Sequence, residues 1–164
     1  MSLIIGKNLG VFFYYARQYD QAIEALQKTV DMDPDFSQVS LALGRAYLQK
    51  SMYEEALAEF QKEMRKSGFG VTLIGITYAK MGRREEALQL LDDLINRSKE
   101  EYVSPVGMAS LYFALGENDQ GFKWLDKAYE DLDSNLCYIK VSPRFESVRS
   151  DPRFKAILKK MGLE

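Results

Sequence analysis

Apolar residues recur along the first 133 positions at intervals of three and four, the spacing that places them on one face of an α-helix. Short polar or glycine-containing breaks divide this pattern into segments of ten to fifteen residues. A proline at position 34 closes the second segment, because the residue before a proline leaves the helical region. We predict amphipathic helices at residues 5–17, 19–32, 36 or 37 to 49 with Ser37 as a cap, 53–66, 69–81, 84–97, 103–115 and 119–132.

The helical segments also repeat as pairs. Gly10, Phe13, Ala22 and Leu26 stand 34 residues before Gly44, Tyr47, Ala56 and Phe60. The next step is 31 residues, to Gly75, Tyr78, Ala87 and Leu91, and the last is 34 again, to Tyr112, Gly121 and Leu125. A glycine inside a helix costs about 1 kcal/mol relative to alanine, so its recurrence in apolar segments predicts a close contact between helices. The pattern therefore predicts four units, each of two antiparallel helices.

This spacing of glycine, tyrosine, alanine and a closing proline resembles the tetratricopeptide repeat. The resemblance covers residues 3–133 and implies an all-α, right-handed superhelical solenoid of four helix pairs. The predicted pairs occupy about residues 3–36, 37–67, 68–101 and 102–133, within a repeat region at 4–133. The fourth pair departs from the pattern, because Ala109 replaces the glycine and Gly121 replaces the alanine. These two exchanges predict an altered contact between its helices.

The tail at residues 134–164 does not follow the repeat pattern. It contains one short motif twice, as Ser-Pro-Arg-Phe at 142–145 and Asp-Pro-Arg-Phe at 151–154. Both read as helix starts, with Ser or Asp as the cap and Pro at the first helical position. Phe154, Ile157, Leu158 and Met161 form one apolar stripe, which predicts a C-terminal helix that caps the last pair. The tail is similar to the ends of tetratricopeptide regions in bacterial and archaeal signalling proteins. Residues 1–3 are compatible with a cloning remnant, and residue 4 onward with a cut from a longer protein.

The amino-acid composition argues against several classes of function. The chain has no histidine, which excludes histidine-activated nucleophiles and histidine-ligated zinc. A net charge of −2 without a basic cluster argues against a nucleic-acid partner for this chain alone. No apolar stretch is long enough for a bilayer, and no phosphate loop or metal-ligand motif is present. We therefore expect no catalytic residues, cofactor, metal or membrane contact, and a single cysteine, Cys137, favours a cytoplasmic protein.

In the family that the chain resembles, peptides lie in the groove lined by the first helix of each pair. By the repeat register, this implies a peptide-binding groove formed by Lys7, Val11, Tyr14, Leu41, Arg45, Leu48, Phe69, Thr72, Ile76, Lys80, Val106 and Phe113. The set is apolar apart from Lys7, Arg45 and Lys80 and one threonine, so a ligand with spaced apolar anchors and one or two acids is expected. Val11 and Ala42 stand where a carboxylate clamp of this family requires asparagine, so that clamp is not supported.

These features predict a protein–protein interaction module, a scaffold or adaptor that binds another protein or a peptide. Two occupants of the apolar groove stay open: a partner segment, or the chain's own tail or a second copy in a homo-oligomer. The alternative function is a regulatory or self-association region of a multidomain signalling protein, fused to a winged-helix regulator, a nucleotide cyclase or a kinase. The sequence upstream of Ile4 would distinguish these two functions.

Overall fold

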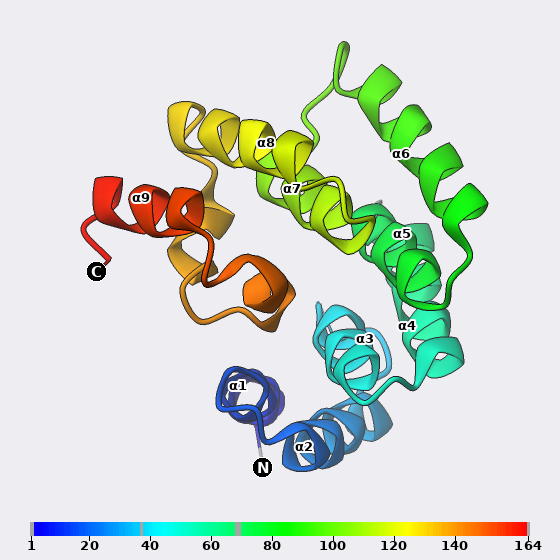
Figure 1. Ribbon diagram of the computed structural model, residues 1–164. Helices are drawn as coiled ribbons and strands as arrows, with labels where there is room; N and C mark the ends of the chain where they lie inside the picture. The colour runs from blue at the N-terminus through cyan, green and yellow to red at the C-terminus, as the bar shows by residue number, and fades with distance from the viewer. Residues whose placement is uncertain (1, 37, 68–69, 164) are drawn as a thin grey trace. The chain divides into compact units, whose positions relative to one another are not determined.

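The computed structural model describes residues 2–36, 38–67 and 70–163, and all of its regular elements are helical (Figure 1). No strand occurs among these residues, which confirms the all-α prediction. The elements are α1 (Leu3–Tyr15), α2 (Tyr19–Met32), α3 (Val39–Gln49), α4 (Tyr53–Ser67), α5 (Val71–Lys80), α6 (Arg84–Arg97), α7 (Pro105–Ala114), α8 (Asn118–Glu130), the 3₁₀ helices η1 (Ser134–Tyr138) and η2 (Pro143–Val148), and α9 (Pro152–Lys160). The cap predicted at Ser37 and the helix start predicted at Phe69 lie outside the described residues.

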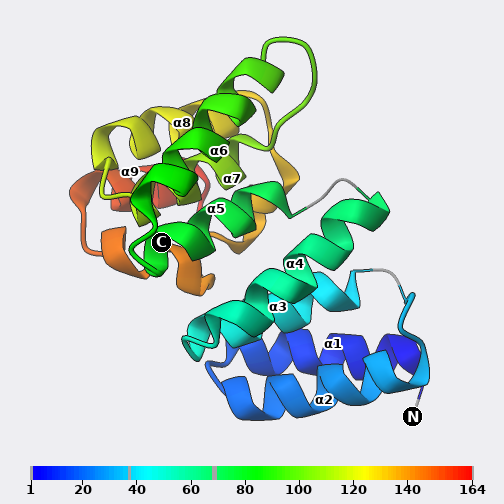
Figure 2. The ribbon, with the colours of Figure 1, turned by 90° about the vertical axis from the view of Figure 1, so that its right-hand side faces the viewer.

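The chain divides into two compact units, Met1–Thr77 and Tyr78–Glu164, with the boundary inside α5. In the first unit, α1 packs against α2, α3 packs against α4, and α2 also packs against α3 (Figure 2). Its core contains Tyr14 of α1 with alanines and leucines of α2 and α3. The first helix of each pair is called here the A helix, and the second the B helix.

Two glycines set the distance between the helices in the first unit, as the repeat pattern predicts. A Cβ atom placed on Gly10 of α1 would lie 2.4 Å from Cγ of Leu26 on α2. A Cβ atom on Gly44 of α3 would lie 2.6 Å from Cε1 of Phe60 on α4. Real Cβ contacts are not this short, so each pair depends on a bare backbone on the A helix facing a large side chain on the B helix.

The α7–α8 pair of the second unit reverses this arrangement. Here Gly121 lies on the B helix, and a Cβ atom on it would be 2.3 Å from Cε1 of Phe113 on the A helix. The large side chain has moved to the first helix and the glycine to the second. The exchange of residues seen in the sequence therefore keeps a close contact between the helices with the two partners swapped. Arg84 of α6 joins this pair by donating to the carbonyl oxygen of Leu115, at 2.6 Å, and to Glu117, at 2.7 Å.

The tail packs on the α7–α8 pair and shares its core. Ser142 and Asp151 each accept a hydrogen bond from the backbone two residues on, and a proline follows each cap, as predicted. Phe145 of η2 and Phe154 of α9 stack at a centroid distance of 5.8 Å, and Phe145 also contacts Phe113 edge to face. Both tail rings are fully buried. The tail thus completes the hydrophobic core of the second unit.

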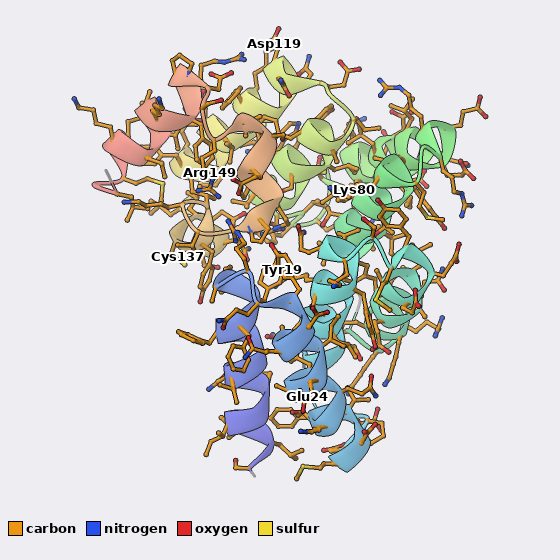
Figure 3. The ribbon with its side chains drawn as sticks, turned by 60° about the horizontal axis from the view of Figure 1, so that its bottom comes forward. Tyr19, Glu24, Lys80, Asp119, Cys137 and Arg149 are labelled. Atoms are coloured by element: carbon orange, nitrogen blue, oxygen red, sulfur yellow. The ribbon has the colours of Figure 1, made fainter. Side chains whose placement is uncertain are left out.

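Two groups of polar contacts hold the tail against the α7–α8 pair. Asp133, which is buried, accepts hydrogen bonds from Ser104 Oγ at 2.7 Å, Val106 N at 3.1 Å and Asn135 N at 2.9 Å. It thereby joins the start of α7 to η1. On α9, Arg153 pairs with Asp119 of α8 at 2.7 Å, and its guanidinium lies 4.1 Å from the centroid of the Phe122 ring (Asp119 is labelled in Figure 3). A cation above an aromatic ring and beside a carboxylate holds α9 against α8.

Candidate peptide-binding surface

The predicted groove residues of the first unit come from three A helices. Tyr14, Leu48 and Ile76 are buried, whereas Lys7, Val11, Leu41, Arg45 and Thr72 are half-buried. The half-buried residues have side-chain surface that a ligand could reach. These five residues, Lys7, Val11, Leu41, Arg45 and Thr72, are called the A-helix face below.

The buried members of the set are structural. Tyr14 is 4% exposed, and its ring contacts those of Tyr15 at 5.1 Å and Tyr19 at 6.1 Å between centroids. Leu48 and Ile76 are each 3% exposed. Buried side chains of this size stabilise the helix packing by about 1.5 to 3 kcal/mol each, and they do not offer a contact surface to a ligand.

The two cations of the A-helix face have no carboxylate partner among the described residues. Lys7 Nζ lies 5.6 Å from the centroid of the Phe36 ring, in a cation–π contact. Arg45 is half-buried, and its Nε atom has no hydrogen-bond acceptor in the part of the chain that the structure describes. A buried N–H group without an acceptor raises the free energy of the unliganded protein, so an incoming carboxylate or carbonyl oxygen at this point is favoured.

Leu41 supplies an apolar contact on the same face, next to the chain between α4 and α5. A Cβ atom on Gly70 would lie 3.4 Å from Leu41 Cδ2 and 3.2 Å from the carbonyl oxygen of Phe60. Gly70 also has φ +102°, a backbone conformation that residues with a side chain rarely adopt. Gly70 therefore keeps the backbone close to Leu41. Phe69, which the sequence also assigned to the groove, lies outside the described residues.

The predicted groove residues of the second unit have a different environment. Val106 is 0% exposed and Phe113 is 5% exposed, and both belong to the core that includes Leu136, Phe145 and Val148 of the tail. The expectation that these two side chains line an open groove is therefore wrong, because the tail covers them. The tail is one of the two occupants that the sequence left open. Lys80, at the end of α5, is exposed (Figure 3).

The described residues contain no group of three or more cysteine, aspartate or glutamate side chains that could hold a metal ion. Asp131 and Asp133, two acids close in the sequence, do not form such a group either. The carboxylate of Asp133 accepts hydrogen bonds at the start of the tail, and Asp131 pairs with Lys127 at 2.9 Å. Cys137 is exposed, and its thiol donates to the carbonyl oxygen of Ser134. None of the helices in these parts of the chain is both long enough and apolar enough to span a membrane.

Helix pairs that recur at steps of 34, 31 and 34 residues, with glycine contacts inside the α1–α2, α3–α4 and α7–α8 pairs, define a helical repeat protein. Two family models, both described as tetratricopeptide repeat, match residues 9–69 and 72–103. Together they cover more than half of the chain, which therefore belongs to the tetratricopeptide-repeat family. This membership makes the chain a protein-interaction repeat module.

Three curated relatives are similar over part of their length. The chain is 30% identical to mouse Superkiller complex protein 3 over 112 residues, which cover 66% of this chain and 7% of that protein. It is 24% identical to the TPR repeat-containing protein YpiA of Bacillus subtilis, over 77% of this chain and 34% of YpiA. It is 27% identical to the Formate-dependent nitrite reductase complex bifunctional subunit NrfFG of Haemophilus influenzae, again over 77% of this chain and 34% of that protein. The chain thus spans 34% or less of each relative's length.

Among solved structures, the chain is similar to MamA AMB-1, with a TM-score of 0.51 and 19% sequence identity. The match covers 98% of this chain and 92% of that structure. At this identity the similarity supports the fold, a solenoid of tetratricopeptide-type helix pairs.

Proposed function

We propose that this chain is an adaptor whose A-helix face binds an acidic, partly apolar segment of a partner protein. The observation that carries the proposal is the half-buried guanidinium of Arg45, whose Nε atom has no acceptor among the described residues. Lys7 is a second cation on the same face, and Val11 and Leu41 add apolar surface. A ligand carboxylate would supply the acceptor that Arg45 Nε lacks, and apolar ligand side chains would contact Val11 and Leu41.

The A-helix face itself contains no acidic side chain, so its charge favours an anionic ligand over a cationic one. The proposal involves no chemistry of its own and no cofactor. It uses only residues of the first unit, because the tail covers Val106 and Phe113 in the second unit. A cytoplasmic location is part of this proposal, because a chain with a single cysteine forms no internal disulfide.

A peptide array tests the proposal. The array holds extended peptides with spaced leucines and either aspartate and glutamate or lysine and arginine between them. We expect the acidic set to bind and the basic set not to bind. Arg45→Glu should weaken binding of the best acidic peptide by about tenfold or more, because it replaces a charge-assisted contact with repulsion. The matched control is Arg65→Glu on α4, an exposed arginine outside the A-helix face, which should bind as the parent does.

Equal binding by Arg45→Glu and the parent would contradict the proposal. The alternative function, a self-association region of a signalling protein, predicts a dimer in solution that Arg45→Glu or Val11→Asp makes monomeric. Sedimentation of the parent and the two variants distinguishes the two functions. Val11→Asp is preferred to a substitution of Leu48, because Leu48 is buried and its replacement by a charge would unfold the helix pair.

A further inference from the structure

Phe36, which the repeat register did not assign to the groove, lies against one of the two cations of the A-helix face. The centroid of its ring is 5.6 Å from Nζ of Lys7, inside the range of a cation–π contact. Phe36 is half-buried and packs on the core of the first unit. The side chain of Lys7 therefore reaches from α1 toward the segment that leads into α3.

Polar contacts hold this segment in place. Asp35 N donates to Oδ1 of Asp33 at 2.9 Å, and Phe36 N donates to the carbonyl oxygen of Asp33 at 3.2 Å. Lys66 of α4 pairs with Asp35 at 3.5 Å. The backbone beside Phe36 is thus tied to the ends of α2 and α4. A ring held in this way orders the flexible Lys7 side chain before a ligand binds, which lowers the entropic cost of binding an anion.

Lys7 and Arg45 lie at different levels of the A-helix face. The helices α1 and α3 pack side by side and run in the same direction (Figure 2). The 34-residue step aligns Lys7 with Leu41, and Arg45 lies beyond Leu41 by one turn, about 6 Å along the helix. Packed helices are about 8 to 10 Å apart, so the Cα atoms of Lys7 and Arg45 are separated by about 10 to 12 Å.

The two cations can each accept one carboxylate. Arg45 Nε is buried and has no acceptor in the part of the chain that the structure describes. The ammonium group of Lys7 has three N–H donors, and a ring on one side leaves the other sides for a carboxylate. Phe36 precedes α3, so its contact draws this ammonium group toward the start of α3 and away from Arg45.

We propose that the ligand of the A-helix face carries two acidic residues, one bound by Arg45 and one by Lys7. This inference rests on the proposed function and adds the spacing of the acids. An extended chain advances about 3.3 Å per residue, so acids three or four positions apart span about 10 to 13 Å. An apolar ligand residue between them contacts Val11 and Leu41. Phe36 is a positioning residue, because it acts on the ligand through Lys7.

The experiment compares fluorescent peptides by anisotropy. All of them share one leucine-containing sequence. One peptide has a single aspartate, and the others have a second aspartate one, three, four or eight positions away. We expect the second acid to tighten binding by about fivefold at three or four positions, and by less than about twofold at one or eight positions, which span about 3 and 26 Å. The measured quantity is the ratio of the two-acid to the one-acid affinity, which a uniform loss of folded protein does not change.

Variants of the chain assign the second acid to its partner. Lys7→Gln should lower the ratio at the best spacing to about one, because the second carboxylate loses its cation. Phe36→Leu keeps an apolar side chain but removes the ring, so it should lower the ratio and weaken the preference for three or four positions over one. Phe36→Tyr keeps the ring and should retain the parent ratio. The matched control is Lys28→Gln, an exposed lysine on α2 outside the A-helix face, which should also retain it.

The outcomes separate this inference from the proposed function. A parent ratio near one at every spacing overturns the two-acid ligand, whereas binding of the one-aspartate peptide that Arg45→Glu weakens still supports the proposed function. Absence of binding by every peptide, to a chain that circular dichroism shows to be helical, overturns both. A ratio that Lys7→Gln abolishes and Phe36→Leu leaves unchanged overturns the positioning role of Phe36.

Discussion

At the scale of single residues, Asp133 shows how a buried charge can stabilise a junction between helices. Burial alone raises the pKa of its carboxyl group. Hydrogen bonds from Ser104, Asn135 and Val106 to the ionised form outweigh that effect and hold the pKa below its ordinary value of 3.8. The carboxylate therefore contributes more to the folded state when it is ionised than when it is protonated.

The first prediction concerns Asp133→Asn. An amide offers one acceptor oxygen and turns an N–H group toward donors, so we expect the free energy of unfolding at pH 7 to fall by about 1 to 3 kcal/mol. The carboxylate contribution is fully present above the ordinary pKa of 3.8 and is lost as the pH drops through the lower folded-state pKa. The difference between parent and variant should thus shrink below pH 3.8. Urea denaturation of both proteins at several pH values measures this difference in the free energy of unfolding.

Asp131→Asn is the control for this prediction. Asp131 lies two residues before Asp133, is exposed, and pairs with Lys127 on the helix surface. Exposed pairs contribute between about 0 and 1 kcal/mol, so this variant should unfold close to the parent. A loss of the same size in both variants would mean that Asp133 acts through its negative charge alone and not through its hydrogen bonds.

At the scale of helices, the B helices were the most predictable elements. The bounds of α2 and α6 agree with those predicted, because each helix has a clear polar face and a clear buried face that contains alanine. The A helices start later or end earlier than predicted. In α3 the predicted start at residue 36 or 37 is replaced by Val39, because Gln38 adopts φ 63°, a left-handed conformation that interrupts the helix. An apolar pattern on both sides of a turn does not reveal such a break.

The contact between α7 and α8 gives the second prediction. Gly121→Ala should destabilise the chain by about 1 to 3 kcal/mol, because its Cβ atom would overlap the Phe113 ring. The overlap opposes the gain of about 1 kcal/mol that alanine otherwise brings inside a helix. Thermal or urea denaturation measures the net change in the free energy of unfolding.

A smaller side chain at position 113 should remove the overlap with a Cβ atom at position 121, and with it the loss of stability. In the background Phe113→Ala, the substitution Gly121→Ala should be neutral or stabilising, since the small side chain leaves room for a methyl group. The four denaturation curves form a double-mutant cycle with a coupling energy. If Gly121→Ala costs the same with Phe113 and with alanine at that position, the two residues do not determine the distance between these helices.

At the scale of the whole molecule, the candidate site was less predictable than the fold. The 34-residue register could only assign A-helix residues to a shared face, since it depends on local periodicity alone. It could not show that the tail buries Val106 and Phe113, because that contact joins residues far apart in the sequence and outside the repeat. Nor could it show that Ile5, Leu9 and Phe12 are exposed, since their apolar character is the same as that of the buried residues at equivalent positions.

The third prediction tests the structural role of the tail. Phe154 is fully buried on α9, so Phe154→Ala should lower the free energy of unfolding by about 3 to 5 kcal/mol through lost contacts and a cavity. Deletion of residues 151–164 should have a larger effect. In a repeat protein each helix pair contacts only its neighbours, so amide hydrogen exchange should rise in α7 and α8 much more than in α1 and α2. Lys155→Ala, an exposed neighbour on the same helix, should behave as the parent. Exchange that rises equally in all helices, or a deletion variant with an unchanged melting temperature, would show that α7 and α8 do not depend on α9.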